Sequence, residues 1–465
     1  MAPSQMASRQ TGALAADLQQ LTMVASYFAR GDHATRATCE MFVRKLPPNR
    51  RFLVAAGLRS LLDALVDWRF TDAQIEALRE VPELRRALTH DFVEFLRGLR
   101  FTGDVYALPE GTVFFESEPL VRVEATLAEA QLIETLLLST LNFQTQVASK
   151  AARIVLASGG RPVLEIGARR SHTEAAVDVA RAAYIAGFEG TTNVEAFYRY
   201  EVPVRSAMSH MYILASSSES EAFTDYARTF ATGAYLVDTY DTLKGVARAL
   251  DTAGPRVTSV RIDSGDLAAL SREVRALLRA RGRDDVKILL SSDLDEYELT
   301  RLVSDGDFDL AGVGTRLAVS DDAPSLTGVY KLVAIGDRPV AKFSTSKTTY
   351  PGAHQVYRHT KDGAYAFDHI GLAREGGYEF VDAAPLLVPV MERGRVVHDE
   401  SLVDLRARTA RELAMLPAAL KEIGARGTPA KARYEVRPSP RLLDVVDEAR
   451  ARMDLSGEGA PVGDS

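Results

Sequence analysis

A short polar run interrupts an apolar stretch near the middle of the chain, in the segment SVRIDSGDLAAL. Asp263, Ser264, Gly265 and Asp266 follow the apolar run directly, and a new apolar pattern begins after them. Two carboxylates and a hydroxyl at a strand-to-helix junction can hold a polar ligand, and a glycine lets the backbone come close to it. Asp266 taken alone is equally well explained as the N-cap of the following helix. The whole run therefore indicates a ligand site better than either aspartate does.

Reactive groups, or groups that can bind phosphate, also follow the other strands that we expect. They are Arg169 and Arg170, Ser209 and His210, Asp238, Ser291 to Asp293, and Gly312, Gly314 and Thr315. In parallel α/β barrels the carboxyl ends of the strands carry the chemistry, so these groups should converge. Guanidinium groups bind carboxylates and phosphates, and successive backbone amides in GVGT can surround a phosphate. The pattern predicts a pocket for a small, anionic, phosphorylated substrate.

Each of these groups has a simpler explanation when it is taken alone. Adjacent arginines such as Arg169 and Arg170 often form a solvated surface pair. A single histidine such as His210 is more often a structural hydrogen bonder than a catalyst, and GVGT alone is an ordinary glycine loop. The prediction therefore depends on their convergence.

The elements that must position these groups alternate between about residues 150 and 320. The expected strands are RPVLEIG, VPVRSAM, AYLVDT, VTSVRID, VKILLSS and FDLAGVG, separated by segments with helical spacing of apolar residues. Such alternation predicts a parallel sheet. This number of units fits a closed α/β barrel better than a doubly wound open sheet.

The flanking regions have a different texture. Helical patterns with one strand-rich patch precede the barrel, and two expected hairpins, GVYKLVAIGDRPVAKFSTS and LLVPVMERGRVV, follow it. We expect an auxiliary domain over residues 1–140, the α/β catalytic domain over 141–330, and a C-terminal part over 331–455. The last segment, 456–465, is expected to be a disordered tail.

Composition excludes several classes of function. The chain has 465 residues, of which 46% are hydrophobic and 26% charged, and its net charge is −7. This predicts a soluble, cytoplasmic protein of two or three domains, with no nucleic acid and no membrane as partner. Cys39 is the only cysteine, which rules out an internal disulfide and a zinc site built on several thiolates.

Several blocks of the sequence resemble the nicotinate phosphoribosyltransferases, in that family's order. The blocks are ATCEMFVRKLPPNRRFLVAAGL, EIGARRSHTEAAVDVARAAYIAGFEGTTNVEA, VRIDSGDL, DLAGVGTRLAVSDDAPSLTGVYKL, KTTYPGAHQVYR and RYEVRPSP. The resemblance implies an irregular α/β barrel with an α+β auxiliary domain built from both chain ends, in a homodimer. It also implies that nicotinate and phosphoribosyl pyrophosphate (PRPP) give nicotinate mononucleotide and pyrophosphate, coupled to ATP hydrolysis, as in NAD salvage.

The same resemblance implies a role for each matching residue. His210 matches the histidine that is phosphorylated in the family. Asp263 and Asp266 would bind ribose hydroxyls or Mg²⁺. The resemblance implies no organic prosthetic group. Arg169 would pair with the acceptor's carboxylate. The residues implied to bind PRPP and its phosphates are Arg170, Arg261, Ser264, Gly265, Gly312, Gly314 and Thr315. Those implied to surround the base, besides Arg169, are Gln19, Thr192 and Asn193.

Two departures from the family pattern affect the base and the ATP step. Gln19 stands where the family's TDLY motif has a tyrosine that packs on the pyridine ring. Around His210 the family's GTMAHS reads SAMSHM here, so that Ser206 replaces a glycine and Met211 a small hydroxyl residue.

Three hypotheses for the function remain open from the sequence. The first is a NAD salvage enzyme that uses nicotinate. The second is a phosphoribosyltransferase of the same fold that uses another small ring or aromatic acid in specialised metabolism. The third is a catalytically silent paralogue that acts as a binding or regulatory subunit, against which the intact DSGD, GVGT and His210 argue.

Overall fold

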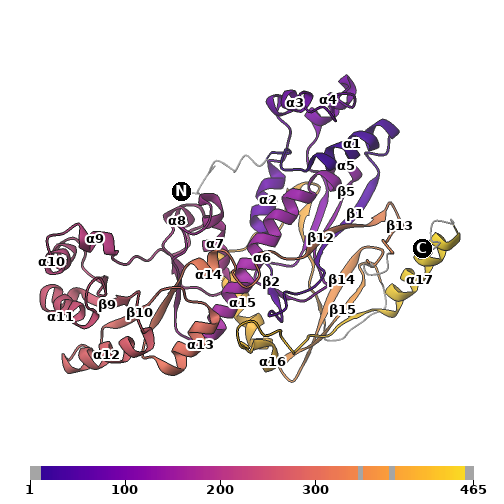
Figure 1. Ribbon diagram of the computed structural model, residues 1–465. Helices are drawn as coiled ribbons and strands as arrows, with labels where there is room; N and C mark the ends of the chain where they lie inside the picture. The colour runs from indigo at the N-terminus through magenta and orange to yellow at the C-terminus, as the bar shows by residue number, and fades with distance from the viewer. Residues whose placement is uncertain (1–11, 344–348, 376–382, 456–465) are drawn as a thin grey trace, which may run out of the picture.

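A computed structural model describes residues 12–343, 349–375 and 383–455 of the chain. A mainly antiparallel region and a parallel α/β region lie side by side, joined by one long helix (Figure 1). The expected disordered tail, 456–465, lies outside the described residues.

Both ends of the chain build the antiparallel region. Its N-terminal elements are α1 Leu18–Arg30, β1 Arg36–Val43, β2 Leu53–Val54, α2 Leu58–Val66, α3 Asp72–Arg79, α4 His90–Gly98, β3 Asp104–Ala107, β4 Val113–Phe114, β5 Pro119–Thr126 and α5 Leu127–Leu132. The C-terminal elements are β12 Gly328–Ile335, β13 Arg338–Pro339, β14 His354–Lys361, β15 Ala364–Leu372, β16 Ala384–Pro385, β17 Val388–Glu392, β18 Arg395–Val396, β19 Val436–Pro438 and α17 Pro440–Leu455. Two helices of the same segment, α15 Leu402–Met415 and α16 Ala418–Lys421, contribute Leu413 and Leu420 to the core of the barrel.

Strands from the two ends alternate in a seven-stranded sheet of order β13-β12-β1-β5-β3-β17-β18. The pairs β12–β13 and β17–β18 are the two expected hairpins. A four-stranded sheet, β16-β14-β15-β19, and the pair β2-β4 complete the region. The expectation of an auxiliary domain made from both chain ends is confirmed.

The parallel region contains the expected alternation of strands and helices. Its elements are β6 Val163–Glu165, α7 Thr173–Ile185, β7 Gly190–Thr191, α8 Val194–Tyr200, α9 His210–Leu214, α10 Glu219–Thr229, β8 Gly233–Leu236, α11 Thr242–Ala253, a 3₁₀ turn Gly254–Arg256, β9 Val257–Ile262, α12 Leu267–Ala280, β10 Lys287–Leu290, α13 Glu296–Asp305, β11 Leu310–Val313 and α14 Thr315–Ala318. The strands form one parallel sheet of order β7-β6-β11-β10-β9-β8. The edge strands β7 and β8 are not paired with each other within the described residues, so the barrel is irregular and open.

One expected strand of the barrel is absent as a regular element. The segment VPVRSAM makes a single parallel bridge, between Val204 and Thr191. Pro203 can accept but cannot donate a backbone hydrogen bond, which limits this segment to a few contacts along β7.

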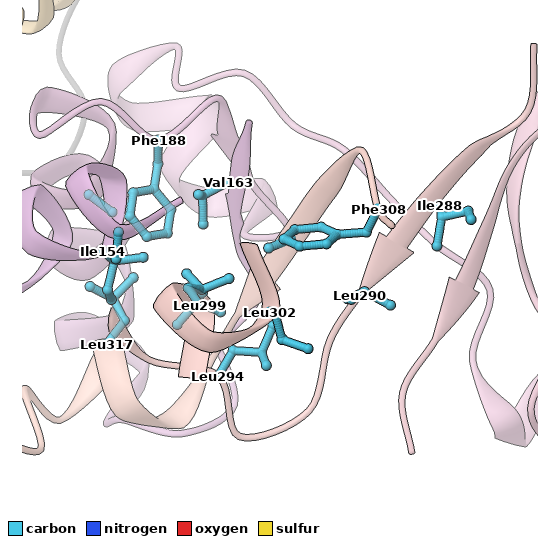
Figure 2. Close-up of a cluster of buried hydrophobic side chains, with 14 of the residues drawn as sticks. Ile154, Val163, Phe188, Ile288, Leu290, Leu294, Leu299, Leu302, Phe308 and Leu317 are labelled. Atoms are coloured by element: carbon cyan, nitrogen blue, oxygen red, sulfur yellow. The ribbon is translucent and has the colours of Figure 1, made fainter. Parts of the chain in front are cut away.

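The long helix α6, Glu134–Ala157, connects the two regions. Its first half contributes Leu137 and Leu141 to the core of the antiparallel region, and its second half contributes Val147 and Ile154 to the core of the barrel. Figure 2 shows Ile154 beside Phe188 in that core, with α13 packed close by. Burying one such side chain contributes about 1.5–3 kcal/mol, so α6 fixes the barrel against the antiparallel region.

Among the helices of the described residues, none combines the length and the apolar character that crossing a bilayer requires.

Candidate active site

Asp263 is the centre of a hydrogen-bond network at the carboxyl end of β9. Its Oδ1 atom accepts from Nη2 of Arg261 at 2.8 Å and from the hydroxyl of Ser291, after β10, at 2.5 Å. Arg261 Nε also donates to Ser291 at 2.9 Å. The backbone amide of Asp263 donates to Oδ2 of Asp238, after β8, at 2.9 Å. Groups from three neighbouring strands therefore meet here, as the sequence predicts.

The rest of the DSGD run has distinct local roles. The hydroxyl of Ser264 donates to Oδ2 of Asp238 at 2.6 Å, and Gly265 has a left-handed backbone with φ of +85°. Asp266 caps α12 by accepting from the backbone amide of Ala269 at 3.1 Å. Asp266 therefore caps the helix, which was the alternative explanation for this residue, whereas Asp263 is part of the hydrogen-bond network.

His210 lies beside this network as the first residue of α9. Its Nδ1 is 3.1 Å from the hydroxyl oxygen of Thr239, and its Nε2 is 3.8 Å from Oδ2 of Asp263. The side chain is 42% exposed, so the ring is partly open to solvent. Met211, the departure next to it, is 81% exposed and leaves the ring uncovered.

The GVGT loop connects β11 to α14 close to the end of β6. Gly312 borders the cavity described below, and a Cβ atom at this position would lie 3.0 Å from Cδ1 of Ile166. Gly314 likewise lies against the backbone oxygen of Ile166, and Thr315 begins α14. A side chain at either glycine would therefore lie against Ile166, the residue that follows β6.

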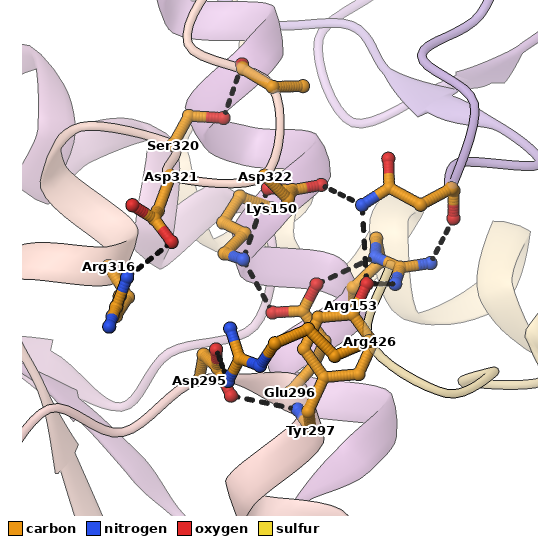
Figure 3. A network of polar contacts seen from close by, with 12 residues as sticks. Lys150, Arg153, Asp295, Glu296, Tyr297, Arg316, Ser320, Asp321, Asp322 and Arg426 are labelled. Atoms are coloured by element: carbon orange, nitrogen blue, oxygen red, sulfur yellow. Dashed lines mark hydrogen bonds and ion pairs between the residues drawn. The ribbon is translucent and has the colours of Figure 1, made fainter. Parts of the chain in front are cut away.

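A buried ionic network anchors the segment that follows this loop (Figure 3). Asp322 binds Nη2 of Arg50 at 2.8 Å and Nζ of Lys150 at 3.1 Å. Lys150 also lies 2.6 Å from Glu296, which pairs with Arg153 at 3.1 Å. Burial alone would raise the pKa of Asp322, but the hydrogen bond and charge of Arg50, with those of Lys150, hold it below its usual value. The network ties the segment after α14 to α6 and α13.

A cavity of about 240 Å³ opens at the same edge of the sheet. It is lined by Leu164, Ile166, Ala168, Arg169, Thr192, Arg205, Ser206, Ala207, Ser209, Arg261, Leu289, Ser291 and Gly312. Arg169, Thr192, Arg261 and Gly312 were expected at the site, and the structure brings them together. Its lining is partly apolar and carries guanidinium groups, which suits a small ring with an anionic substituent.

The other predicted base and phosphate residues lie at or beyond the edge of this cavity. Arg170 is exposed and is not part of the lining. Asn193 caps α8 by accepting from the backbone amide of Ala196 at 3.2 Å. Gln19 is exposed on α1, which lies at the opposite end of the molecule from β9 and β10 (Figure 1). A single chain therefore does not bring Gln19 to the cavity.

Sequence reasoning missed Glu165, the last residue of β6. Its side chain is completely buried and accepts hydrogen bonds from the backbone amide of Gly167 and from the hydroxyl of Thr191, the latter at 2.5 Å. Burial raises the pKa of this carboxyl group, although both hydrogen bonds act in the opposite direction. An acidic residue inside an apolar strand was the available signal.

The fit of Mg²⁺ can be judged from the carboxylates. No cluster of three or more potential metal-ligating side chains exists in the described part of the chain. Asp238 Oδ1 is buried and lacks a hydrogen-bond partner there, close to Asp263. Magnesium usually binds through one or two carboxylates together with substrate phosphates, so this pair fits a metal that arrives with a diphosphate.

Comparisons with known proteins agree with this geometry. The family model for the nicotinate phosphoribosyltransferase (NAPRTase) N-terminal domain matches residues 14–142. A nicotinate phosphoribosyltransferase of Mycobacterium tuberculosis is 41% identical over 466 residues, which cover 98% of this chain and 97% of the relative. One from Bacillus subtilis is 42% identical over 369 residues, covering 75% of this chain and 74% of the relative.

A solved structure extends the likeness to the whole fold. The crystal structure of human nicotinic acid phosphoribosyltransferase matches with a TM-score of 0.79 and 28% identity, covering 93% of this chain and 99% of the human one. The chain therefore belongs to the nicotinate phosphoribosyltransferase family.

Proposed function

We propose that the enzyme transfers the phosphoribosyl group of PRPP to the ring nitrogen of nicotinate and couples this step to ATP hydrolysis. The bond from the ribose anomeric carbon to the diphosphate breaks, a bond to the ring nitrogen forms, and pyrophosphate leaves. The observation that carries the proposal is the network around Asp263 beside a cavity lined by arginines.

The ribosyl half of the reaction is assigned to Asp263 and its neighbours. Arg261 and Ser291 occupy Oδ1 of Asp263, which leaves Oδ2 directed toward the side of His210. A fixed carboxylate stabilises positive charge that develops on the ribose as the diphosphate departs. Mg²⁺, held by Asp263 and Asp238 with the diphosphate, would neutralise the leaving group. The 5′-phosphate would bind along Gly312, Gly314 and Thr315.

The acceptor half is assigned to the arginines of the cavity. Arg169 follows β6 on the lining and would pair with the carboxylate of nicotinate, while Thr192 borders the same space. A guanidinium fork matches a carboxylate geometrically. The ring would lie over the apolar part of the lining, formed by Leu164, Ile166 and Leu289.

His210 is assigned the ATP step. Its Nδ1 is engaged by Thr239, so Nε2 is the atom that would attack the γ-phosphorus. A bond from nitrogen to phosphorus forms, the bond to ADP breaks, and later hydrolysis releases inorganic phosphate. The phosphoenzyme would favour nucleotide formation over the reverse reaction.

A homodimer would complete the site. Large apolar side chains are exposed on the helices near the cavity: Val194, Phe197, Tyr198, Met211 and Leu214. A second copy would cover part of this surface, and its α1 could bring Gln19 to the cavity of the first. Sedimentation analysis should give twice the chain mass of 50.7 kDa; a monomer that retains full activity would remove Gln19 from the site.

The test of the proposal is a product assay. The purified protein is incubated with PRPP and nicotinate, with and without ATP, and the nucleotide is identified by mass. We expect nicotinate mononucleotide in both reactions and more of it with ATP. No nucleotide from any aromatic acid would refute phosphoribosyl transfer and favour the silent paralogue, whereas a nucleotide from another acid alone would favour the alternative acceptor.

A further inference from the structure

Glu165 is a fully buried carboxyl group at the end of β6, between two residues that line the cavity. Leu164 and Ile166, on either side of it in the sequence, belong to the lining, whereas Glu165 does not. Within the described residues its oxygens accept from one backbone amide and one hydroxyl, and no lysine, arginine or histidine pairs with it. Burying a carboxyl group costs free energy unless hydrogen bonds compensate it. The role of Glu165 therefore depends on the two segments that donate these hydrogen bonds.

The first of these segments is the turn that carries Arg169. Oε1 of Glu165 accepts from the backbone amide of Gly167, and the backbone oxygen of Gly167 accepts from the amide of Arg170 at 2.8 Å, which closes the turn. A Cβ atom at position 167 would lie 3.0 Å from that same carboxyl oxygen, so glycine permits the close approach. Arg169 lies inside the turn and lines the cavity. Glu165 thus fixes the backbone from which the Arg169 side chain extends.

The second segment is the turn that carries Thr192. Oε2 of Glu165 accepts from the hydroxyl of Thr191 at 2.5 Å, and the oxygen of this hydroxyl accepts from the backbone amide of Asn193 at 2.9 Å. Thr192, between these two residues, lines the cavity. Its backbone amide donates to the backbone oxygen of Glu165 at 3.0 Å. The side chain and the backbone of Glu165 therefore hold this turn together.

We propose that Glu165 is a positioning residue for the acceptor, which fixes Arg169 and Thr192 relative to each other while it touches no substrate itself. Groups that bind a ligand must be held within about 0.5 Å of the productive geometry, and one buried side chain spans both turns here. The groups assigned to PRPP, such as Asp263 after β9 and Gly312 on β11, do not bond to this side chain. The inference rests on the proposed function, because that function assigns Arg169 and Thr192 to nicotinate.

The experiment removes one hydrogen bond at a time. Glu165→Gln keeps the shape of the side chain, but its amide nitrogen donates and cannot accept. Thr191→Val removes the hydroxyl, and Thr191→Ser keeps it. The matched control is Glu129→Gln on α5: Glu129 is also buried and accepts from the hydroxyl of Thr102 at 2.8 Å and from the backbone amide of Thr126 at 3.3 Å. The Michaelis constants for nicotinate and PRPP, the melting temperature and the binding of nicotinate by calorimetry are measured for each protein.

We expect Glu165→Gln and Thr191→Val each to raise the Michaelis constant for nicotinate by about tenfold, as the loss of one hydrogen bond to a charged group can. The constant for PRPP should stay unchanged. The double variant should raise the nicotinate constant by less than the product of the two single effects, because both variants disturb the same bond. Thr191→Ser should match the wild type. Glu129→Gln should lower the melting temperature and leave both constants unchanged.

An unchanged nicotinate constant in both Glu165→Gln and Thr191→Val, or an equal rise in the constants for nicotinate and PRPP, would overturn the inference while nucleotide formation by the wild type upholds the proposed function. A wild type that binds nicotinate more tightly than Glu165→Gln does, but forms no nucleotide, would refute the proposed function alone.

Discussion

His210 and Asp263 face each other across the carboxyl edge of the parallel sheet, with Nε2 of the histidine 3.8 Å from Oδ2 of the aspartate. Thr239 engages the opposite ring nitrogen at 3.1 Å. The group assigned to the ATP step therefore lies next to the group assigned to the ribose, which gives phosphorylation a direct route to influence the transfer.

The first prediction concerns His210. Incubation with ATP labelled at the γ-phosphate should give an acid-labile, base-stable adduct, because phosphohistidine has that stability pattern. His210→Ala should abolish the label and leave slow, ATP-independent transfer, and the exposed His90→Ala should retain the label. A wild type that never hydrolyses ATP would remove the coupling role.

The second prediction concerns Gln19 as a residue that one subunit contributes to the active site of the other. An aromatic ring stacked on a pyridine contributes about 0.5–1.5 kcal/mol beyond area burial, or roughly threefold to tenfold in affinity. Gln19→Tyr should therefore lower the Michaelis constant for nicotinate. An unchanged Michaelis constant would mean that Gln19 is an exposed residue of α1 with no role in binding the acceptor.

The third prediction concerns the buried ionic network. Lys150 is 1% exposed and Glu296 is fully buried, so Lys150→Met removes a buried cation that pairs with both Glu296 and Asp322. Breaking a buried pair in this way costs about 3–5 kcal/mol, which urea denaturation should detect. The exposed Lys244→Met should change the unfolding free energy by less than about 0.5 kcal/mol; an equal loss in both variants would contradict this account of the network.

The fourth prediction concerns pH and two histidines of β14 and β15. His359 Nε2 and His369 Nδ1 lie 3.2 Å apart. Burial lowers the pKa of both histidines, and the charge of the nearby Arg437 lowers each pKa further. The charge of His359 also lowers the pKa of His369, whereas Asp368 raises both pKa values. The folded protein then binds these protons less readily than the unfolded chain, so stability should be lost as pH falls below about 6.5.

The measurement is the melting temperature between pH 7.5 and 5.5. The wild type should lose stability over this window, and His359→Asn with His369→Asn should flatten the dependence. His90→Asn, on the exposed start of α4, should keep the slope of the wild type. A double variant that keeps that slope as well would contradict the assignment.

Much of the barrel was predictable because its periodicity is local. Strand and helix alternation, together with a polar residue at each strand end, anticipated Asp263, Ser291 and Gly312 at one edge. The prediction of a regular strand at Pro203 was wrong, since the pairing of this segment with β7 depends on a partner elsewhere in the chain. Glu165 was missed for the same reason: its role arises from its contact with Thr191, which no spacing rule reveals.

Acceptor-dependent release of pyrophosphate from PRPP tests the central claim most directly, when the wild type is compared with Asp263→Asn. The side-chain amide of the variant cannot supply the negative charge that the ribose or Mg²⁺ requires, although the backbone amide of residue 263 keeps its hydrogen bond to Asp238. We predict at least a tenfold lower rate with every acceptor and a melting temperature close to that of the wild type. A rate near that of the wild type would remove Asp263 from the site and contradict the account.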